Sequence, residues 1–197
     1  MPFLKTVRKR FRVLRLTALL LIASACFLSG RVSAADSVVA LEYKVKGGYL
    51  YNIAKFVEWP TNTFIDADSP LVIGVIDGGG EGVAVLQALL EGKKVDGHPV
   101  QLKAVTADKV GQDIQILFVT RTARISPEEI RTALGGAATL LVGETDQFAE
   151  RGGMVGFTRE ADNIRLSLNL ELATEAGLKV SSTIARVAKL VKTKRNK

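Results

Sequence analysis

The sequence is poor in the residues from which most catalytic and metal-binding sites are built. Its 197 residues include one histidine, one cysteine and one tryptophan. His98 stands in Asp96-Gly97-His98-Pro99, a turn-like setting that favours a structural role. A serine nucleophile would have to use this histidine, and no Gly-x-Ser-x-Gly motif accompanies it. A histidine-based metal site lacks partners. We therefore predict no catalytic residue, no metal ligand and no cofactor.

The single cysteine, Cys26, belongs to an N-terminal segment that resembles a secretory signal peptide. A basic leader precedes a short uncharged apolar run, Leu16–Leu28, which is shorter than the roughly 20 residues of a membrane span. Val32-Ser33-Ala34 then supplies small residues that suit a leader peptidase. We predict a signal peptide over residues 1–34, cleavage between Ala34 and Ala35, and a periplasmic protein.

A lipid anchor at Cys26 is the alternative to simple export. Ala23-Ser24-Ala25-Cys26 loosely resembles the box that precedes a lipidated bacterial cysteine, but its first residue is alanine where leucine is usual. We favour the interpretation that Cys26 is a small apolar residue of the signal peptide. The predicted mature chain then has no cysteine, so it forms no disulfide and binds no zinc or iron–sulfur cluster through thiolates.

Removal of the leader also removes the excess of positive charge. Seven of the 27 basic residues and none of the 20 acidic residues lie before Ala35, which leaves 20 of each sign. A nucleic-acid-binding function based on charge is therefore excluded. The C-terminal tail stays locally basic, with lysines at 189, 192, 194 and 197 and Arg195. A solvated, frayed end is the favoured interpretation, and contact with anionic lipid or cell wall is the alternative.

The remaining chain, residues 35–197, is long enough for one domain with its own core. Apolar runs that suit strands alternate with helical patterns, which predicts a mainly parallel sheet with helices on both faces. The expected strands are 71–76, 99–105, 114–119, 138–142, 153–157 and 164–170, and the expected helices are 44–58, 82–90, 127–134 and one from about 182. The predicted fold is thus a three-layer α/β domain with a C-terminal antiparallel hairpin at the sheet edge and a terminal helix.

The most informative segment is the predicted first helix. Val45, Tyr49, Ile53, Phe56 and Val57 recur at helical spacing and form one apolar stripe. Pro60 disfavours the helical conformation of the residue before it, so the helix should end near Trp59. Two adjacent glycines, Gly47 and Gly48, interrupt the pattern, and they indicate either a close backbone crossing or a later helix start.

The glycine-rich segment Asp77-Gly78-Gly79-Gly80-Glu81-Gly82 lies between a predicted strand and a predicted helix, the place of a phosphate-binding loop. Its spacing departs from Gly-x-Gly-x-x-Gly, and its two carboxylates would repel phosphate. We interpret it as a flexible loop. Aromatic residues gather nearby in the sequence at Tyr43, Tyr49, Tyr51 and Trp59, where core packing is favoured over a contact patch.

Several blocks of the sequence, in order, resemble the YfiR-like family of periplasmic proteins. Gly48–Pro60, with Tyr-Asn-x-x-Lys-Phe-Val-Glu-Trp-Pro, and Phe148–Phe157, with Arg-Gly-Gly-Met, are the most specific in combination. The other matching blocks are Leu71–Val75, Gly92–Val100, Gln115–Val119 and Ile164–Leu170. The resemblance extends over nearly the whole chain after the leader.

This resemblance implies a non-enzymatic regulator. The family's namesake inhibits a membrane-bound diguanylate cyclase of the YfiN type, so an inner-membrane diguanylate cyclase or a sensor kinase is the expected partner. The namesake uses cysteine pairs, and one of its cysteines lies just before the central strand, where this chain has Gln112-Asp113-Ile114. Thiol-based redox sensing is therefore excluded here. We predict that the partner contacts Asn52, Lys55, Glu58 and Trp59.

Two other functions stay open at the level of the sequence. A periplasmic carrier or sensor of a small molecule would use a cleft at the carboxyl ends of the parallel strands. An enzyme of unrecognised type is the third and least favoured interpretation. The receptor, the stimulus and the oligomeric state, including a homodimer, are left open by the sequence.

Overall fold

The computed structural model describes residues 34–80, 82–111, 113–161 and 163–194. The chain divides into two compact units, Met1–Ser37 and Val38–Lys197, and the second contains the strands. Residues 1–33 of the predicted signal peptide, which include Cys26, lie outside the described residues. Ala34 and Ala35, between which we predict cleavage, are the first residues of helix α2 (Ala34–Lys55).

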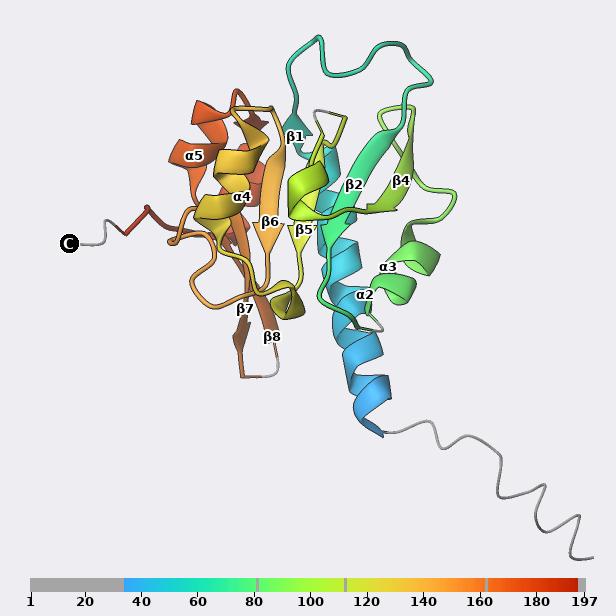
Figure 1. Ribbon diagram of the computed structural model, residues 1–197, viewed down its shortest axis with the longest axis vertical. Helices are drawn as coiled ribbons and strands as arrows, with labels where there is room; N and C mark the ends of the chain where they lie inside the picture. Colours follow the sequence, from blue (N-terminus) through green and yellow to red (C-terminus); the bar gives the residue numbers. More distant parts are fainter. Residues whose placement is uncertain (1–33, 81, 112, 162, 195–197) are drawn as a thin grey trace, which may run out of the picture. The chain divides into compact units, whose positions relative to one another are not determined.

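An eight-stranded sheet forms the centre of the Val38–Lys197 unit (Figure 1). Its order is β10-β8-β7-β6-β5-β2-β4-β3, and the five strands from β7 to β4 are parallel. The bounds are β2 Leu71–Ile76, β3 Lys94–Val95, β4 His98–Ala104, β5 Ile116–Val119, β6 Leu140–Gly143, β7 Val155–Glu160, β8 Asn163–Leu168 and β10 Lys189–Leu190. A separate two-stranded sheet pairs β1 (Val57–Glu58) with β9 (Lys179–Val180).

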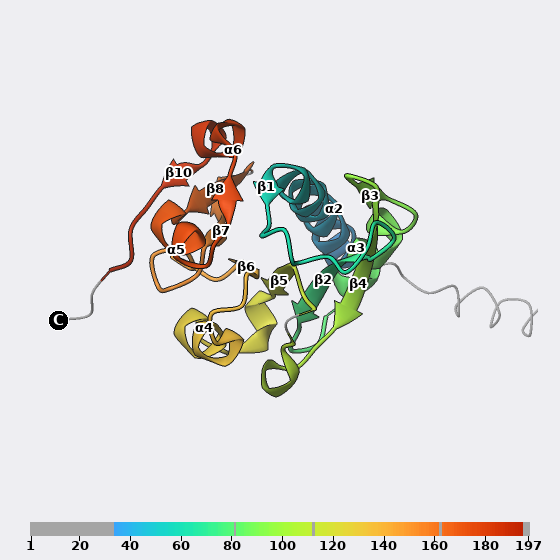
Figure 2. The same cartoon turned by 90° about the horizontal axis from the view of Figure 1, so that it is seen from above.

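Helices cover both faces of the sheet, as the alternation of elements predicted. Helices α2 and α3 (Gly82–Leu90) lie over one face and α4 (Pro127–Leu134) over the other (Figure 2). Two further short helices, α5 (Leu170–Glu175) and α6 (Ser182–Val187), follow the hairpin. All residues of β2, β5 and β6 are buried, because these central strands are covered on both sides.

The predicted hairpin is present as β7 and β8, which pair antiparallel from Val155↔Leu168 to Glu160↔Asn163. The two-residue strand β10 lies outside it, parallel to β8. The helix expected from about residue 182 is present as α6, which ends at Val187, and the chain then extends into β10.

The prediction for the first helix was wrong in its end and in part of its buried face. Helix α2 ends at Lys55, and residues 57–58 form β1, because their backbone pairs with β9. Val45 and Phe56 of the predicted stripe are 42% and 38% exposed. Ile53 and Val57 of the stripe are buried as predicted, and the buried face also includes Lys46, Leu50 and Ala54. A lysine is seldom fully buried, so the sequence pattern pointed to a neighbouring face.

The paired glycines of α2 mark a close helix crossing. A Cβ atom on Gly47 would lie 2.6 Å from Leu89 Cδ2 and 3.0 Å from Leu86 Cδ2 of α3. Gly47 therefore allows the two helices to approach, and the alternative of a later helix start is wrong. A Cβ atom on Gly48 would meet no heavy atom within 4 Å, and nothing in the structure explains that glycine.

Candidate functional site

Polar side chains gather where the parallel strands end. Asp77 follows β2, Thr120 follows β5, and Glu144 follows β6. After β2 the chain adds β4 on one side of the sheet, and after β5 it adds β6 on the other side. The direction in which strands are added therefore reverses between β2 and β5. Such a switch point, at the carboxyl ends of the strands, is where open α/β sheets usually bind ligands.

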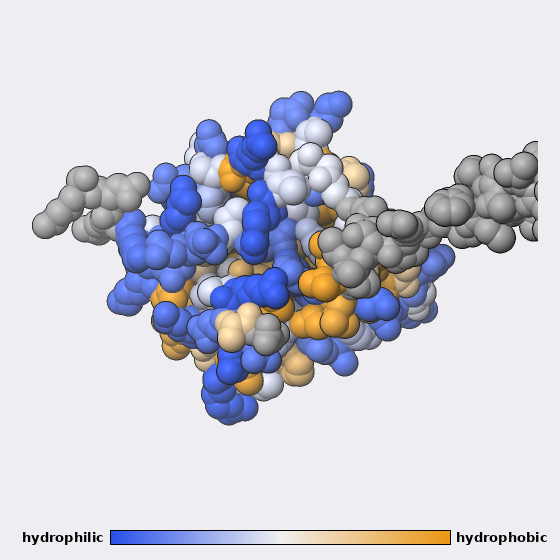
Figure 3. Space-filling view, turned by 90° about the horizontal axis from the view of Figure 1, so that it is seen from below, coloured by the Kyte–Doolittle hydropathy of each residue, from blue (hydrophilic) through white to orange (hydrophobic). Residues whose placement is uncertain are grey.

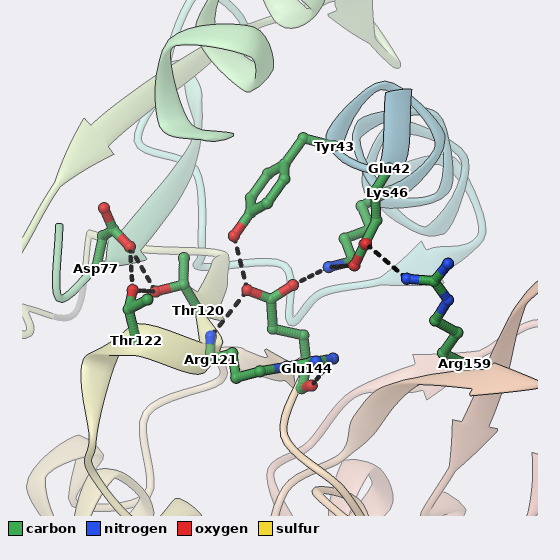
Figure 4. A network of polar contacts seen from close by, with 9 residues as sticks. All are labelled: Glu42, Tyr43, Lys46, Asp77, Thr120, Arg121, Thr122, Glu144 and Arg159. Atoms are coloured by element: carbon green, nitrogen blue, oxygen red, sulfur yellow. Dashed lines mark hydrogen bonds and ion pairs between the residues drawn. The ribbon is translucent and has the colours of Figure 1, made fainter. Parts of the chain in front are cut away.

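A buried ion pair joins α2 to this edge of the sheet. Lys46 is 1% exposed, and its Nζ donates a hydrogen bond to Glu144 Oε2, whose side chain is also buried (Figure 4). The same Nζ lies 2.5 Å from Glu42 Oε1, one helical turn earlier. The lysine nitrogen thus lies between two carboxylates, so its buried charge is paired.

Glu144 receives two more donors, so its carboxylate is fully engaged. Tyr43 donates its hydroxyl to Glu144 Oε1 at 2.7 Å, and the backbone N–H of Arg121 donates to the same oxygen at 2.8 Å. The Arg121 guanidinium also reaches the Glu144 carbonyl at 3.3 Å. We call Glu42, Tyr43, Lys46, Arg121 and Glu144 the carboxyl-end network. It ties the helix to the ends of β5 and β6 by charge-assisted hydrogen bonds.

A second polar group lies beside this network at the switch point. Thr120 and Thr122 donate their hydroxyls to Asp77 Oδ1 at 2.6 and 2.8 Å. The backbone N–H of Gly78 donates to Thr122 Oγ1 at 3.2 Å. The start of the glycine-rich loop is therefore tied to the end of β5 by the Asp77 carboxylate. Seen from the carboxyl ends, the surrounding surface is mostly hydrophilic (Figure 3).

The network shifts the pKa values of two of its members in opposite directions. Burial and the nearby carboxylate of Glu144 raise the pKa of Tyr43 far above its usual range. Burial would raise the pKa of Glu42 as well, but the hydrogen bond from Lys46 and the positive charges of Lys46, Arg121 and Arg159 lower it overall. At neutral pH the phenol is thus a neutral donor and the carboxylate a charged acceptor.

We expect Tyr43 to remain protonated while the protein is folded in alkaline solution. The phenolate absorbance that develops as the folded protein is brought to about pH 11 should be equal in the wild type and Tyr43→Phe. Because the folded-state pKa is raised, the stabilisation from Tyr43 is present below about pH 10 and is lost as the pH rises further. The wild type should therefore lose more stability than Tyr43→Phe between pH 9 and about 11. A larger phenolate signal in the folded wild type would contradict this assignment.

The predicted contact residues lie in the last turn of α2 and in the segment just after it, beyond the part of the helix that carries the carboxyl-end network. Asn52, Lys55 and Glu58 are exposed. Trp59 is only partly exposed, packs against the core, and donates its indole N–H to the Gln115 carbonyl at 3.3 Å. The structure thus separates these residues from the network, and it places Trp59 in a structural contact. Their role in binding stays a prediction.

Sequence reasoning missed the centre of the carboxyl-end network, Lys46 and Glu144. One signal was available: Glu42 and Lys46 are spaced i, i+4 on the helix, and Lys46 shares a face with Leu50. His98, by contrast, lies at the amino end of β4, where Nδ1 is 2.7 Å from the Ser69 carbonyl and the ring stacks on Phe64. The lone imidazole is therefore distant from the carboxyl ends of the strands.

In the part of the chain that the structure describes, no helix combines the length and the apolar character that a membrane crossing needs. Over the same ranges, no three histidine, cysteine, aspartate or glutamate side chains group as metal ligands.

Comparisons with known proteins point to one family. The model of the YfiR/HmsC-like family matches residues 43–189. A crystal structure of a conserved domain protein from Vibrio cholerae is similar with a TM-score of 0.50 and 15% identity, over 77% of this chain and 60% of that one. A domain from Streptococcus pneumonia, crystallised with L-Trp and titled an ABC domain, has a TM-score of 0.44 and 12% identity, over 61% and 55%. No curated protein matches the sequence.

Proposed function

Because the chain belongs to the YfiR/HmsC-like family, we propose that it is a periplasmic regulator of an inner-membrane diguanylate cyclase. It would bind the periplasmic part of the cyclase and restrain cyclic-di-GMP synthesis without catalysing a reaction itself. The observation that carries this proposal is the family match over residues 43–189, nearly all of the Val38–Lys197 unit. The Vibrio structure supports the fold alone, and this chain spans 60% of its length.

Contact alone can produce such regulation. A protein that binds one conformation of a receptor tenfold more tightly than another shifts their equilibrium by about 1.4 kcal/mol. The binding energy of a few well-placed side chains is sufficient for this difference. The proposed activity therefore needs an exposed contact surface and a rigid support for it.

The junction of α2 and β1 offers such a surface. Asn52, Lys55 and Glu58 are exposed, and Phe56 between them is 38% exposed. The backbone beneath them is held by pairing of Val57 with Val180 in the two-stranded sheet. We call Asn52, Lys55, Phe56 and Glu58 the α2–β1 patch. It combines an aromatic side chain with charges of both signs, a composition that suits a polar protein contact.

Reversal of charge at Lys55 should weaken binding to the periplasmic part of the cyclase. We expect Lys55→Glu to lower the affinity about tenfold or more, because a reversed charge places like charges opposite each other in the interface. Titration calorimetry with the purified periplasmic part of the receptor would measure it. Lys109→Glu, at an exposed lysine of the 3-10 helix Ala107–Lys109, is the matched control. Trp59→Ala is a poor test because Trp59 packs on the core.

Failure of any envelope receptor to bind would overturn the proposal. The protein should be captured with its partners from a detergent-solubilised envelope, with Lys55→Glu as the comparison. Recovery of a diguanylate cyclase that the variant loses supports the proposal. Recovery of a sensor kinase in its place would keep the regulatory class and contradict the cyclase.

A second candidate function is the sensing of a small polar ligand at the switch point. The group formed by Asp77, Thr120 and Thr122 at the ends of β2 and β5 favours it. Such a ligand should raise the melting temperature of the protein in the absence of any protein partner. Loss of that shift in Asp77→Asn, with the unliganded stability retained, would support this function over contact alone.

A further inference from the structure

A basic edge lies at the end of the sheet where β10 is outermost. From residue 176 to the C-terminus the sequence has seven basic residues and no acidic one. Arg186, Lys189, Lys192 and Lys194 are all exposed. Among the ion pairs of the described residues, none involves these four side chains. Since the chain after residue 34 has equal numbers of basic and acidic residues, this edge is a local concentration of charge.

Exposed aliphatic side chains are interleaved with the charges. Val187 is 68% exposed, Leu190 is 57% exposed, and Leu170 of α5 is 39% exposed. Leu170 and Leu190 line one hollow of about 250 Å³ together with Glu171, Val191 and Lys192. An apolar hollow beside a lysine ammonium matches the two parts of a phospholipid, an acyl chain and a charged headgroup.

The strand itself makes a poor site for another chain. Strand β10 has two residues, and short edge strands carrying lysine resist pairing with other strands. Polar protein interfaces usually present charges of both signs, whereas the exposed charges from Arg186 to Lys194 are all positive. Glu171 of α5 is the one carboxylate among the residues that line the hollow. An anionic surface is therefore the better electrostatic complement to this edge than a mixed protein surface.

We propose that the basic edge, Arg186, Val187, Lys189, Leu190 and Lys192, binds the surface of a bilayer that contains anionic phospholipid. The lysines and arginine would contact the headgroups while Val187 and Leu190 enter the interfacial region. Binding is peripheral and reversible, because the apolar contribution is only a few side chains. This surface is separate in sequence from the α2–β1 patch, and the inference does not depend on the identity of the receptor.

Vesicle co-sedimentation tests the proposal without any receptor. The protein in the form that the cell accumulates, with its first residue determined by mass spectrometry, is mixed with vesicles of phosphatidylcholine with or without phosphatidylglycerol. Each basic residue at an anionic surface contributes about fivefold in partitioning. We therefore expect Lys189→Gln/Lys192→Gln to bind about 25-fold more weakly to the anionic vesicles. Leu190→Ser should also weaken binding, and added salt should weaken the wild type.

The matched control removes the same charge elsewhere. Lys44→Gln/Lys109→Gln replaces two lysines that are exposed on α2 and on the 3-10 helix. It should retain nearly all binding if the basic edge is the contact. Equal losses in the two double variants, or binding of the wild type to neither vesicle, would overturn the proposal. An edge variant that loses a captured envelope protein but no vesicle binding would assign the edge to a protein instead.

Discussion

Replacement of Lys46 by methionine should lower the free energy of unfolding by about 3–5 kcal/mol at neutral pH. Lys46 is 1% exposed, and its only neighbours of opposite charge in the ion pairs described here are Glu42 and Glu144. Without the ammonium group the Glu144 carboxylate remains buried and uncompensated, and burial of an unpaired charge is among the costliest changes a core can suffer. Urea unfolding at constant m-value would measure the loss.

If the loss in Lys46→Met comes from the unpaired charge, a second variant and a control should behave differently from it. Lys46→Met/Glu144→Gln removes both buried charges, so it should recover most of the stability that the single variant loses. Lys44→Met, at an exposed position two residues away, should change stability by less than about 0.5 kcal/mol. A Lys46→Met variant as stable as the wild type would contradict the assignment.

Truncation of Phe148 to alanine should cost about 3–5 kcal/mol of unfolding free energy. Phe148 is 1% exposed, and its ring lies between two glycines of neighbouring segments. A Cβ atom on Gly143 or on Gly153 would come within 2.2 Å of that ring. The ring therefore fills a space made for it by the missing side chains, and its removal leaves a cavity that rigid strands cannot close.

The same packing predicts a complementary effect at Gly153. Gly153→Ala should destabilise by about 1–3 kcal/mol, because the added methyl group overlaps the Phe148 ring. Phe148→Leu/Gly153→Ala should lose less than the sum of its single changes, because each relieves the other. Phe56→Ala is the matched aromatic control, since Phe56 is 38% exposed and should lose less than half as much as Phe148→Ala. Equal losses at the two phenylalanines would contradict this account.

The helix and strands whose signals are local could be predicted from the sequence. Helix α4 spans Pro127–Leu134 as expected, because Ser126 accepts a hydrogen bond from the Glu129 N–H and the Glu129 carboxylate reaches back to the Ser126 N–H. The helix also ends at Leu134 as predicted, because Gly135 adopts the left-handed conformation with φ of 57°. Strand β2 matches residue for residue, since a β-branched run buried on both faces is unambiguous.

The elements that depend on distant partners could not be predicted. Strands β1, β9 and β10 have two residues each, too few for any periodic pattern, and they exist because of the backbone groups opposite them. The Asp96-Gly97 turn was visible, with φ of 50° and 92°, but the short strand β3 before it was not. The prediction of the family and of the three-layer fold was confirmed by the family match and by the sheet.

The candidate site shows the same division. Asn52 and Lys55 lie on an exposed part of α2, as their polarity indicated, and Glu58 is also exposed, although it belongs to β1 and not to the helix. Lys46 was missed because its place in the core is set by Glu144, which lies 98 residues further along the chain. Propensity rules assign a lysine to solvent, and only the tertiary partner overrides them.

That long separation sets the order in which the molecule can mature. Tyr43 and Lys46 can form their contacts only after Glu144 has been synthesised, and residues 57–58 can pair only after β9 (Lys179–Val180). The first helix therefore cannot form all of its contacts until most of the polypeptide is present. Contacts so remote in sequence slow folding through the entropy of loop closure. Docking of α2 is therefore expected to be one of the last steps of folding, because its polar partner Glu144 and the strand that pairs with β1 lie in the second half of the chain.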